Sequence, residues 1–268
     1  MGISAWQSFL LGILQGAAEF LPVSSSGHLV LLPWLLHWPA PPLTYDVIVH
    51  LGTLVAVGIA FWRDIGDLFR GVWSILRTRR LVNAEARLVA LLLLSAIPGA
   101  LLGYFLEDRF AALFGSPLRV SVLLAVTGLL LVLSERLGTR ERALPQMGWG
   151  DALLMGIAQG CAIAPGLSRS GTTIAAGLLR GLDRQTATRF SFLMSLPIIL
   201  GATGYQMLHL LRGEAGEVSL LSLAIGFVAA AASGYLAVRF LLRYVRRHSL
   251  RPFAYYCWAL SLLGLILS

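Results

Sequence analysis

The chain contains no lysine and little charge of any kind. Of its 268 residues, 57% are hydrophobic and only 13% are charged, and all 21 basic residues are arginines. Soluble domains carry about 25% charged residues, so this composition excludes an ordinary water-soluble enzyme and predicts a membrane protein. The net charge of +8 does not indicate nucleic-acid binding, because the arginines lie in clumps between long apolar runs rather than among aromatic residues on one face. We expect no nucleic-acid partner.

Cysteine is equally scarce. The two cysteines, Cys161 and Cys257, lie in apolar surroundings and have neither a CxxC partner nor a nearby histidine at a metal-binding spacing. This pattern argues against a metal-thiolate site or a redox pair, so we expect both cysteines only to pack.

Long apolar stretches dominate what the chain does contain. A helix needs roughly 20 mostly apolar residues to cross the hydrocarbon core of a bilayer. Six stretches meet this requirement, near 44–62, 87–106, 117–135, 187–208, 218–238 and 252–268.

Two further apolar regions, 5–37 and 149–182, are interrupted in the middle by Pro, Gly and Ser. The interruptions run from Leu21 to His28 and from Pro165 to Thr172. Irregular polar backbone at membrane depth is tolerated only where protein buries it or where it lines a watery cavity. Each region is therefore predicted to form a re-entrant helix-loop-helix hairpin, which makes the whole an all-α polytopic membrane protein.

An internal repeat relates these two hairpins. A shift of 144 positions brings Gly12–Gly16 onto Gly156–Gly160, and the same shift superimposes the serines and glycines of the two interruptions. The sequence thus predicts one membrane domain, 1–268, built from repeat one (1–143) and repeat two (144–268), each with a hairpin and three spans. Because three is odd, the repeats have inverted topology and their loops can meet. Secondary transporters share this architecture, so it does not settle the function.

The arginines predict the orientation. Seventeen of the 21 fall in loops on one side of the predicted spans, three (Arg109, Arg119 and Arg212) fall on the other, and Arg169 lies inside the second hairpin. The positive-inside rule assigns the 17-arginine side to the cytoplasm. Both termini are then expected on the outer face.

Polar residues inside the hairpins are the candidates for chemistry. Gln15 and Glu19 share one helix face, and an intramembrane carboxylate is by default a functional hypothesis. Glu19 could bind a divalent cation, Mg²⁺ or Ca²⁺, with Gln15 as co-ligand, could act as a general base, or could simply be satisfied within its own hairpin. His28 follows a run of serines and can transfer a proton at neutral pH, whereas His50 is expected to pack or bond locally.

Arg169 and the half-helix termini favour an anionic ligand. Helix N-termini and loop amides attract anions, and a guanidinium is a planar, multi-donor cation suited to phosphate or carboxylate. The sequence by itself therefore predicts an anion-binding site between the hairpins.

Two long motifs resemble those of one known family. The stretch from Gln15 through Glu19 to Phe20-Leu21-Pro22-Val23-Ser24-Ser25-Ser26-Gly27-His28, and the stretch Pro165-Gly166-Leu167-Ser168-Arg169-Ser170-Gly171-Thr172-Thr173, are similar to the signatures of undecaprenyl-diphosphatases, the bacitracin-resistance family. Ala187–Phe192 also resembles that family. The resemblance covers essentially the whole chain.

The resemblance implies hydrolysis of undecaprenyl diphosphate to undecaprenyl phosphate and inorganic phosphate. This reaction recycles the lipid carrier of peptidoglycan synthesis at the bacterial inner membrane, in a site that faces the periplasm and uses a divalent cation. By the same resemblance, Glu19, Ser25, His28 and Arg169 are the catalytic residues, and Glu19 and Gln15 hold the metal. The polar, substrate-binding lining is Gln15, Ser24, Ser26, Gly27, Ser168, Ser170, Gly171, Thr172 and Thr173.

Several alternatives stay open at this point. The nucleophile is Ser25, His28 or a metal-bound water. The rival function is transport, in which the same hairpins carry a lipid phosphate or another anion across the bilayer as a transporter or flippase. A homodimer is possible, because the small residues from Gly226 to Gly234 permit close contact between helices.

Overall fold

The computed structural model describes residues 3–211 and 218–268. Arg212, which the sequence assigns to the sparsely charged side, lies outside these residues. Across the described ranges the chain is helical and has no β-strand. The α-helices are α1 (Ala5–Phe20), α2 (Ser25–Leu35), α3 (Leu43–Ala60), α4 (Trp62–Thr78), α5 (Ala84–Phe114), α6 (Pro117–Leu137), α7 (Trp149–Cys161), α8 (Arg169–Leu179), α9 (Arg184–Leu211), α10 (Leu220–Tyr244) and α11 (Arg251–Leu267).

Within the described residues, five helices are long and apolar enough to cross a membrane, namely α3, α5, α6, α9 and α10. They correspond to five of the six predicted spans, so the polytopic, all-α class expected from the sequence is confirmed. The stretch 252–268 corresponds to α11, an apolar helix of 17 residues. This length is at the lower limit for a bilayer span.

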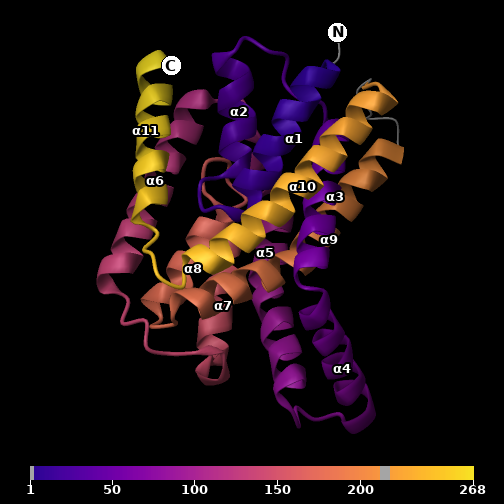
Figure 1. Ribbon diagram of the computed structural model, residues 1–268, viewed down its shortest axis with the longest axis vertical. Coiled ribbons are helices and arrows are strands. Elements are labelled where there is room, and N and C mark those ends of the chain that lie inside the picture. Colours follow the sequence, from indigo (N-terminus) through magenta and orange to yellow (C-terminus); the bar gives the residue numbers. More distant parts are fainter. Residues whose placement is uncertain (1–2, 212–217) are drawn as a thin grey trace.

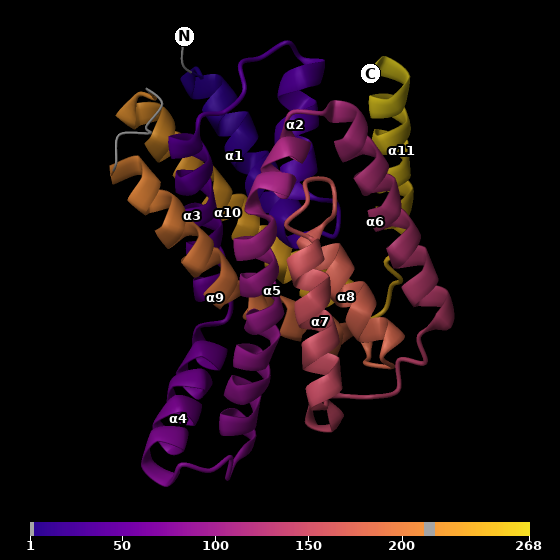
Figure 2. The same ribbon diagram turned by 180° about the vertical axis from the view of Figure 1, so that it is seen from behind.

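The segment after α3 differs from the expectation. The sequence treats 63–86 as an arginine-rich connection, but α4 is a strongly amphipathic helix over most of it. Arg63, Arg70 and Arg77 are spaced by seven residues, two helical turns, so they share a face. Because of these charges, the sequence analysis did not detect the apolar face of this helix, where Phe69 and Trp73 are exposed. Figures 1 and 2 show α4 projecting from the end of the molecule opposite to both termini.

Both interrupted regions form pairs of short helices that turn back on themselves. In Figure 2, α1 and α2 occupy the half of the molecule that contains both termini, whereas α7 and α8 occupy the other half. The irregular segments are residues 21–24 and 162–168. The first begins at residue 21, as predicted, but ends at 24 rather than 28, and the second runs from 162 to 168 rather than from 165 to 172. Both end early because Ser24 and Ser168 cap the next helices.

Glycines place the first helix of each pair against a helix of the other half of the chain. α1 packs on α10, and α7 packs on α5. A Cβ on Gly16 would lie 2.3 Å from the Ala230 carbonyl oxygen, and one on Gly156 would lie 2.4 Å from that of Ser95. Only glycine allows helix backbones to approach so closely, which explains the glycines of the repeated motif.

The small residues of α10 are used within the chain. Gly226 contacts Tyr45, and a Cβ on Gly234 would contact Ala56 and Phe20. The stripe that suggested a homodimer is therefore covered by α1 and α3, and the homodimer stays a prediction without support from these residues.

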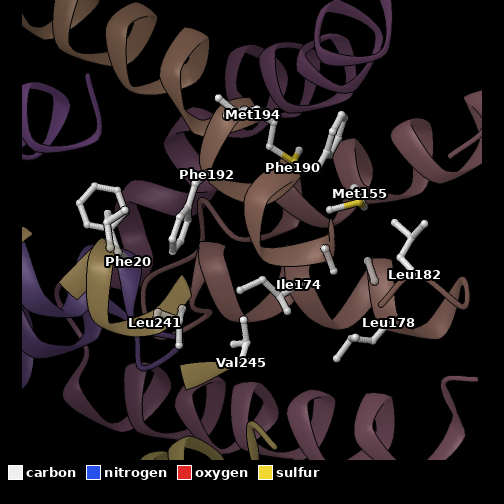
Figure 3. Packing of buried hydrophobic residues seen from close by; sticks show 14 of the residues in the cluster. Phe20, Met155, Ile174, Leu178, Leu182, Phe190, Phe192, Met194, Leu241 and Val245 are labelled. Carbon is white, nitrogen blue, oxygen red and sulfur yellow. The ribbon is translucent and has the colours of Figure 1, made fainter. Parts of the chain in front are cut away.

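A hydrophobic core joins the two halves beside the hairpins (Figure 3). It brings Phe20 of α1 together with Ile174 of α8 and Phe192 of α9. The rings of Phe20 and Phe192 meet edge to face with their centroids 5.4 Å apart. Because Phe20 follows Glu19 directly, this packing fixes the end of α1 from which the carboxylate projects.

Two buried carboxylates, away from the hairpin breaks, accept hydrogen bonds from several connecting segments. Glu135, 2% exposed, accepts hydrogen bonds from Arg140, Arg184 and the Leu250 N–H. Asp151, at the start of α7, accepts from Arg142, from Arg180 and from the Gly148 N–H. Burial by itself would raise the pKa of the Asp151 carboxyl, but these hydrogen bonds outweigh burial and hold its pKa below the usual value.

Candidate active site

The two hairpin breaks meet each other. The Ser170 hydroxyl donates to the Leu21 carbonyl oxygen at 3.0 Å, which joins the end of α1 to the start of α8. Thr127 of α6 holds the second break in place, because its hydroxyl donates to the Gly166 carbonyl and accepts from the Ser168 N–H, each at 3.0 Å. Gly166 has a φ of +97°, a conformation that glycine adopts without strain. The predicted meeting of the two Ser/Gly loops is therefore observed.

Glu19 is the centre of this junction. Its side chain is 7% exposed, and one oxygen, Oε1, accepts from Arg169 Nη2 at 2.6 Å. The other oxygen, Oε2, accepts from the Ser25 hydroxyl at 2.6 Å and from the Gln15 amide at 3.0 Å. Four of the residues singled out in the sequence thus form one hydrogen-bonded group drawn from both hairpins.

The serines on either side of Ser25 and Arg169 build two equivalent helix starts. Ser24 accepts from the Gly27 N–H and Ser168 from the Gly171 N–H, each at 3.1 Å. These N-caps satisfy helix donors that would otherwise lack a partner. The neighbouring Ser26 and Ser170 hydroxyls contact the capping serines at 3.4 and 3.2 Å. The N-termini of α2 and α8 therefore both begin at the junction, where they favour an anion.

Backbone strain is confined to the first of these starts. Ser24 has a φ of +71°, a conformation that costs a residue with a Cβ about 1–3 kcal/mol. The turn from Phe20 to Ser25 is only four residues long, and this conformation reverses the chain tightly enough to bring Ser25 back onto Glu19. Ser168 has an ordinary φ of −68°, because the second break is longer and contains Gly166.

His28 lies apart from Ser25 and Glu19. Its ring nitrogens contact the Ser24 carbonyl and the Tyr256 hydroxyl, each at 2.7 Å, and its ring stacks on that of Tyr256. Thr172, the residue 144 positions later, bonds the Ser168 carbonyl in the same way. Both side chains therefore secure the first turn of their helix. The catalytic role of His28 stays a prediction.

Thr173 is the remaining residue of the predicted lining. Its hydroxyl contacts the Arg169 carbonyl and the Ser191 hydroxyl, each at 2.7 Å. It thus links the first turn of α8 to α9, and it is fully buried.

Gln15 and Glu19 do not form a ready cation site in this arrangement. Both Glu19 oxygens already accept hydrogen bonds, and Gln15 points an amide N–H at the carboxylate. A divalent cation prefers several oxygen ligands and would have to displace these donors. Among the described residues, no group of three or more His, Cys, Asp or Glu side chains is placed to hold a metal.

A cavity of about 680 Å³ opens beside the junction. Its polar lining contains Glu19, Ser25, Ser26 and Arg169 together with Asp46, His50 and Gln159. Its apolar walls include Leu29, Trp34, Trp38, Ile163, Leu167 and Ile199. A cavity with charged groups at one place and apolar walls elsewhere suits an amphiphilic ligand with an anionic head group.

Asp46, His50 and Gln159 were missed by the sequence analysis, as were Thr203 and Gln206, which also line the cavity. His50 does bond locally, as expected, through the Asp46 carbonyl at 2.7 Å, but it also faces the cavity. The acid Asp46 within a predicted span was the available signal. Gln159 was recognisable as the counterpart of Gln15 in the second repeat.

The arrangement can transfer a proton and bind an anion at the same place. The Ser25 hydroxyl is within hydrogen-bonding distance of a carboxylate that can accept its proton. Arg169 has one guanidinium nitrogen on Glu19, while its other terminal nitrogen, Nη1, is buried and has no partner in the structure. A hydroxyl, a carboxylate and a guanidinium nitrogen without a partner among the described residues therefore share one cavity.

Comparison with known proteins identifies relatives across the whole chain. The family model described as "Bacitracin resistance protein BacA" matches residues 8–263. A protein of Moorella thermoacetica named "Undecaprenyl-diphosphatase" is 46% identical over 250 residues, which are 93% of this chain and 92% of the relative.

Proteins with the same name from other bacteria are similar to this chain over nearly their whole length. One from Rubrobacter xylanophilus is 46% identical over 260 residues, 96% of each chain. One from Thermomicrobium roseum is 41% identical over 272 residues, 98% of each chain.

Proposed function

The chain belongs to the bacitracin resistance protein BacA family, and from this membership and the junction at Glu19 we propose that it is an undecaprenyl-diphosphatase. It hydrolyses undecaprenyl diphosphate to undecaprenyl phosphate and inorganic phosphate. The reaction recycles the lipid carrier of peptidoglycan synthesis and underlies resistance to bacitracin.

One observation carries the catalytic part of the proposal. Glu19 accepts hydrogen bonds from Ser25 and from Arg169 in a cavity with apolar walls. The two donors match the two needs of the reaction, because a phosphatase must activate a nucleophile and neutralise the charge of the phosphate that it attacks.

In the proposed first step, Ser25 attacks the terminal phosphorus. Its Oγ forms the new bond to phosphorus as its proton passes to Glu19, 2.6 Å away. The bond between that phosphorus and the bridging oxygen breaks, and undecaprenyl phosphate leaves with the electron pair. In-line attack of this kind depends chiefly on positioning and on stabilising charge.

Arg169 and the helix N-termini stabilise that charge. The free Nη1 of Arg169 donates to the phosphate oxygens, and the N-termini of α2 and α8, which begin at the same junction, favour the same negative charge. In the second step the oxygen of a water molecule bonds to the phosphorus of the phosphoserine, the bond from that phosphorus to Ser25 Oγ breaks, and inorganic phosphate is released while Ser25 Oγ takes up the proton that Glu19 accepts from the water. Glu19 can accept the proton of this water once the first proton has left with the lipid phosphate.

The divalent cation expected from the sequence is proposed to bind together with the substrate. Since both Glu19 oxygens are occupied, the diphosphate would have to supply most of the oxygen ligands. Mg²⁺ commonly binds proteins in this way, through one or two carboxylates and the phosphates of a substrate.

The decisive experiment is phosphate release by the purified protein in detergent. Farnesyl diphosphate serves as a soluble isoprenyl probe, and the assay is repeated after chelation with EDTA and after addition of Mg²⁺ or Ca²⁺. Detergent-solubilised protein has no two sides, so release of inorganic phosphate requires catalysis. Farnesyl diphosphate binding without release would favour the rival function, transport of a lipid phosphate.

We further propose that the two hairpins are re-entrant and that residues 1–143 and 144–268 are inverted repeats, each with three spans. Two observations support this. The helix starts at Ser24 and Ser168 have equivalent hydrogen bonds, and the pairing of α1 with α10 is repeated by α7 with α5.

The same proposal places the protein in the bacterial inner membrane with both termini and the cavity opening on the periplasmic side. The arginine-rich segments lie at the opposite end, whereas loop 36–42 at the end with the termini contributes Trp38 and Pro41 to the cavity wall. In a Cys161→Ser background, an impermeant thiol reagent should label Pro39→Cys but not Arg140→Cys in intact spheroplasts. The reverse pattern would overturn the orientation.

A further inference from the structure

Gln159 is a buried amide that the chain itself does not use. Its side chain on α7 is 2% exposed, and neither its Nε2 nor its Oε1 has a hydrogen-bond partner in the described structure. A buried amide without partners is costly, and a leucine of similar volume would be more stable there. Such a group in a native protein calls for a specific explanation.

Gln159 differs in its hydrogen bonding from Gln15, its counterpart in the first hairpin. Gln15 occupies the corresponding place in α1 and donates to Glu19 four residues later. The residue four positions after Gln159 is Ile163, in the break that follows α7, and its side chain cannot accept a hydrogen bond. The repeat therefore preserves the amide but omits the carboxylate that accepts from the Gln15 N–H, while the Oε1 of both glutamines has no partner among the described residues.

Gln159 also lines the cavity beside the Glu19 junction. Among the polar groups of that lining, the Ser25 hydroxyl is already bonded to Glu19 and the Ser26 hydroxyl contacts that of Ser24. Arg169 Nη1 and Gln159 Nε2 are donors that remain without a partner. A diphosphate has two phosphate groups, and the reacting one must lie beside Ser25 and Arg169.

We propose that Gln159 is a substrate-binding residue whose amide N–H donates to an oxygen of the phosphate group that stays on the lipid. This inference rests on the proposed diphosphatase function. A neutral amide recognises that phosphate without adding positive charge, so it orients the substrate and still allows the lipid monophosphate to leave.

The test compares Gln159→Leu with the wild-type protein. Loss of a hydrogen bond to a charged group should raise the KM for farnesyl diphosphate about tenfold or more, with a smaller change in kcat. Inhibition by farnesyl phosphate should weaken by a similar factor, while inhibition by inorganic phosphate should stay within about twofold. The matched control, Gln185→Leu, changes an exposed amide at the start of α9 and should leave these constants unchanged.

The thermal stability of Gln159→Leu distinguishes a substrate-binding role of Gln159 from a structural one. Because Gln159 has no partners to lose, Gln159→Leu should melt at the same temperature as the wild type or higher. A lower melting temperature with an unchanged KM would overturn the inference. Weaker inhibition by inorganic phosphate instead of farnesyl phosphate would also overturn it, since Gln159 would then contact the reacting phosphate.

Direct binding keeps this test independent of turnover. Trp34 and Trp38 line the cavity, so farnesyl phosphate binding can be followed by tryptophan fluorescence. If the wild-type protein binds this probe but releases no phosphate from farnesyl diphosphate, the proposed function fails. A roughly tenfold weaker binding to Gln159→Leu would still support the contact, and equal binding would refute it.

Discussion

Ser25 and Arg169 occupy corresponding places 144 residues apart, and they donate hydrogen bonds to the two different oxygens of Glu19, each at 2.6 Å. Each is the first residue of the second helix of its hairpin. One half of the chain thus provides a hydroxyl and the other a cation at the same structural position. The carboxylate between them links the Ser25 hydroxyl to the Arg169 guanidinium.

Arg169→Ala should impair substrate binding more than turnover. Truncating one partner of a buried, hydrogen-bonded charge pair costs about 2–5 kcal/mol, which corresponds to a kcat/KM lowered by about 30-fold or more, mainly through KM. Arg169→Lys should recover little, because a single ammonium lacks the planar fork that lets Arg169 bond Glu19 and still present Nη1. Steady-state kinetics measure both, and an unchanged KM and kcat in Arg169→Ala would contradict the assignment.

Ser25→Ala should abolish most of the turnover. Removal of a nucleophile that acts together with its base lowers kcat by several orders of magnitude, so we expect a fall of at least about 1,000-fold. Ser26→Ala is the matched comparison, since Ser26 contacts Ser24 and not Glu19, and it should lose less than about tenfold. Rapid acid quench followed by mass spectrometry should find phosphate on Ser25. Near-full turnover in Ser25→Ala would leave water or His28 as the nucleophile.

Gly16→Ala should destabilise the protein although alanine is the better helix former. Its Cβ would lie 2.1 Å from the Ser233 Oγ and 2.3 Å from the Ala230 carbonyl oxygen, and overpacking typically costs about 1–3 kcal/mol. Gly58→Ala in α3 is the control, because a Cβ there meets nothing within 4 Å. Thermal unfolding in detergent should show a lower midpoint for Gly16→Ala and an equal or higher one for Gly58→Ala. Equal midpoints for the two variants would refute the close packing of α1 against α10 at Gly16.

Stability should depend on pH through Asp151. The folded state holds the pKa of Asp151 below its usual value, whereas the pKa of an Asp carboxyl in an unfolded chain is about 3.9. The stabilisation is therefore fully present above that pH and is lost as the pH falls through the folded pKa. The difference in melting temperature between wild type and Asp151→Asn should be largest near pH 7 and should shrink toward about pH 3.

A control isolates this carboxylate from the others. Glu141 is an exposed acid in the same loop region, so the melting difference between wild type and Glu141→Gln should be small and should not vary with pH. A gap for Asp151→Asn that stays constant between pH 7 and 3 would show that its contacts do not depend on ionisation.

Much of this arrangement is readable from the sequence because it depends on local signals. Length and hydropathy locate the spans, and the Pro, Gly and Ser residues locate both breaks. The repeated glycines of α1 and α7 mark the close helix crossings. The convergence on Glu19 was predictable in outline, since a buried carboxylate and an arginine inside opposed hairpins have to be satisfied by some partner.

The parts that the sequence could not provide depend on contacts between distant segments. α4 was not predicted because an arginine-rich segment is typical of a loop, although the spacing of these arginines is that of a helix. The sequence left the base open between His28 and Glu19, and it did not specify that the His28 ring nitrogens contact the Ser24 carbonyl and the Tyr256 hydroxyl. The roles of Asp46, His50 and Gln159 as cavity walls follow from the way α3 and α7 pack, which no local pattern specifies.

The crossed pairing of α1 with α10 has a consequence for how the protein is made. α1 is synthesised well before its main partner α10, and Glu19 meets Arg169 only after both hairpins exist. Contacts of such long range delay assembly until their second member is available. During synthesis the Glu19 carboxylate therefore has its partners within the first hairpin, Gln15 and Ser25, before Arg169 is made.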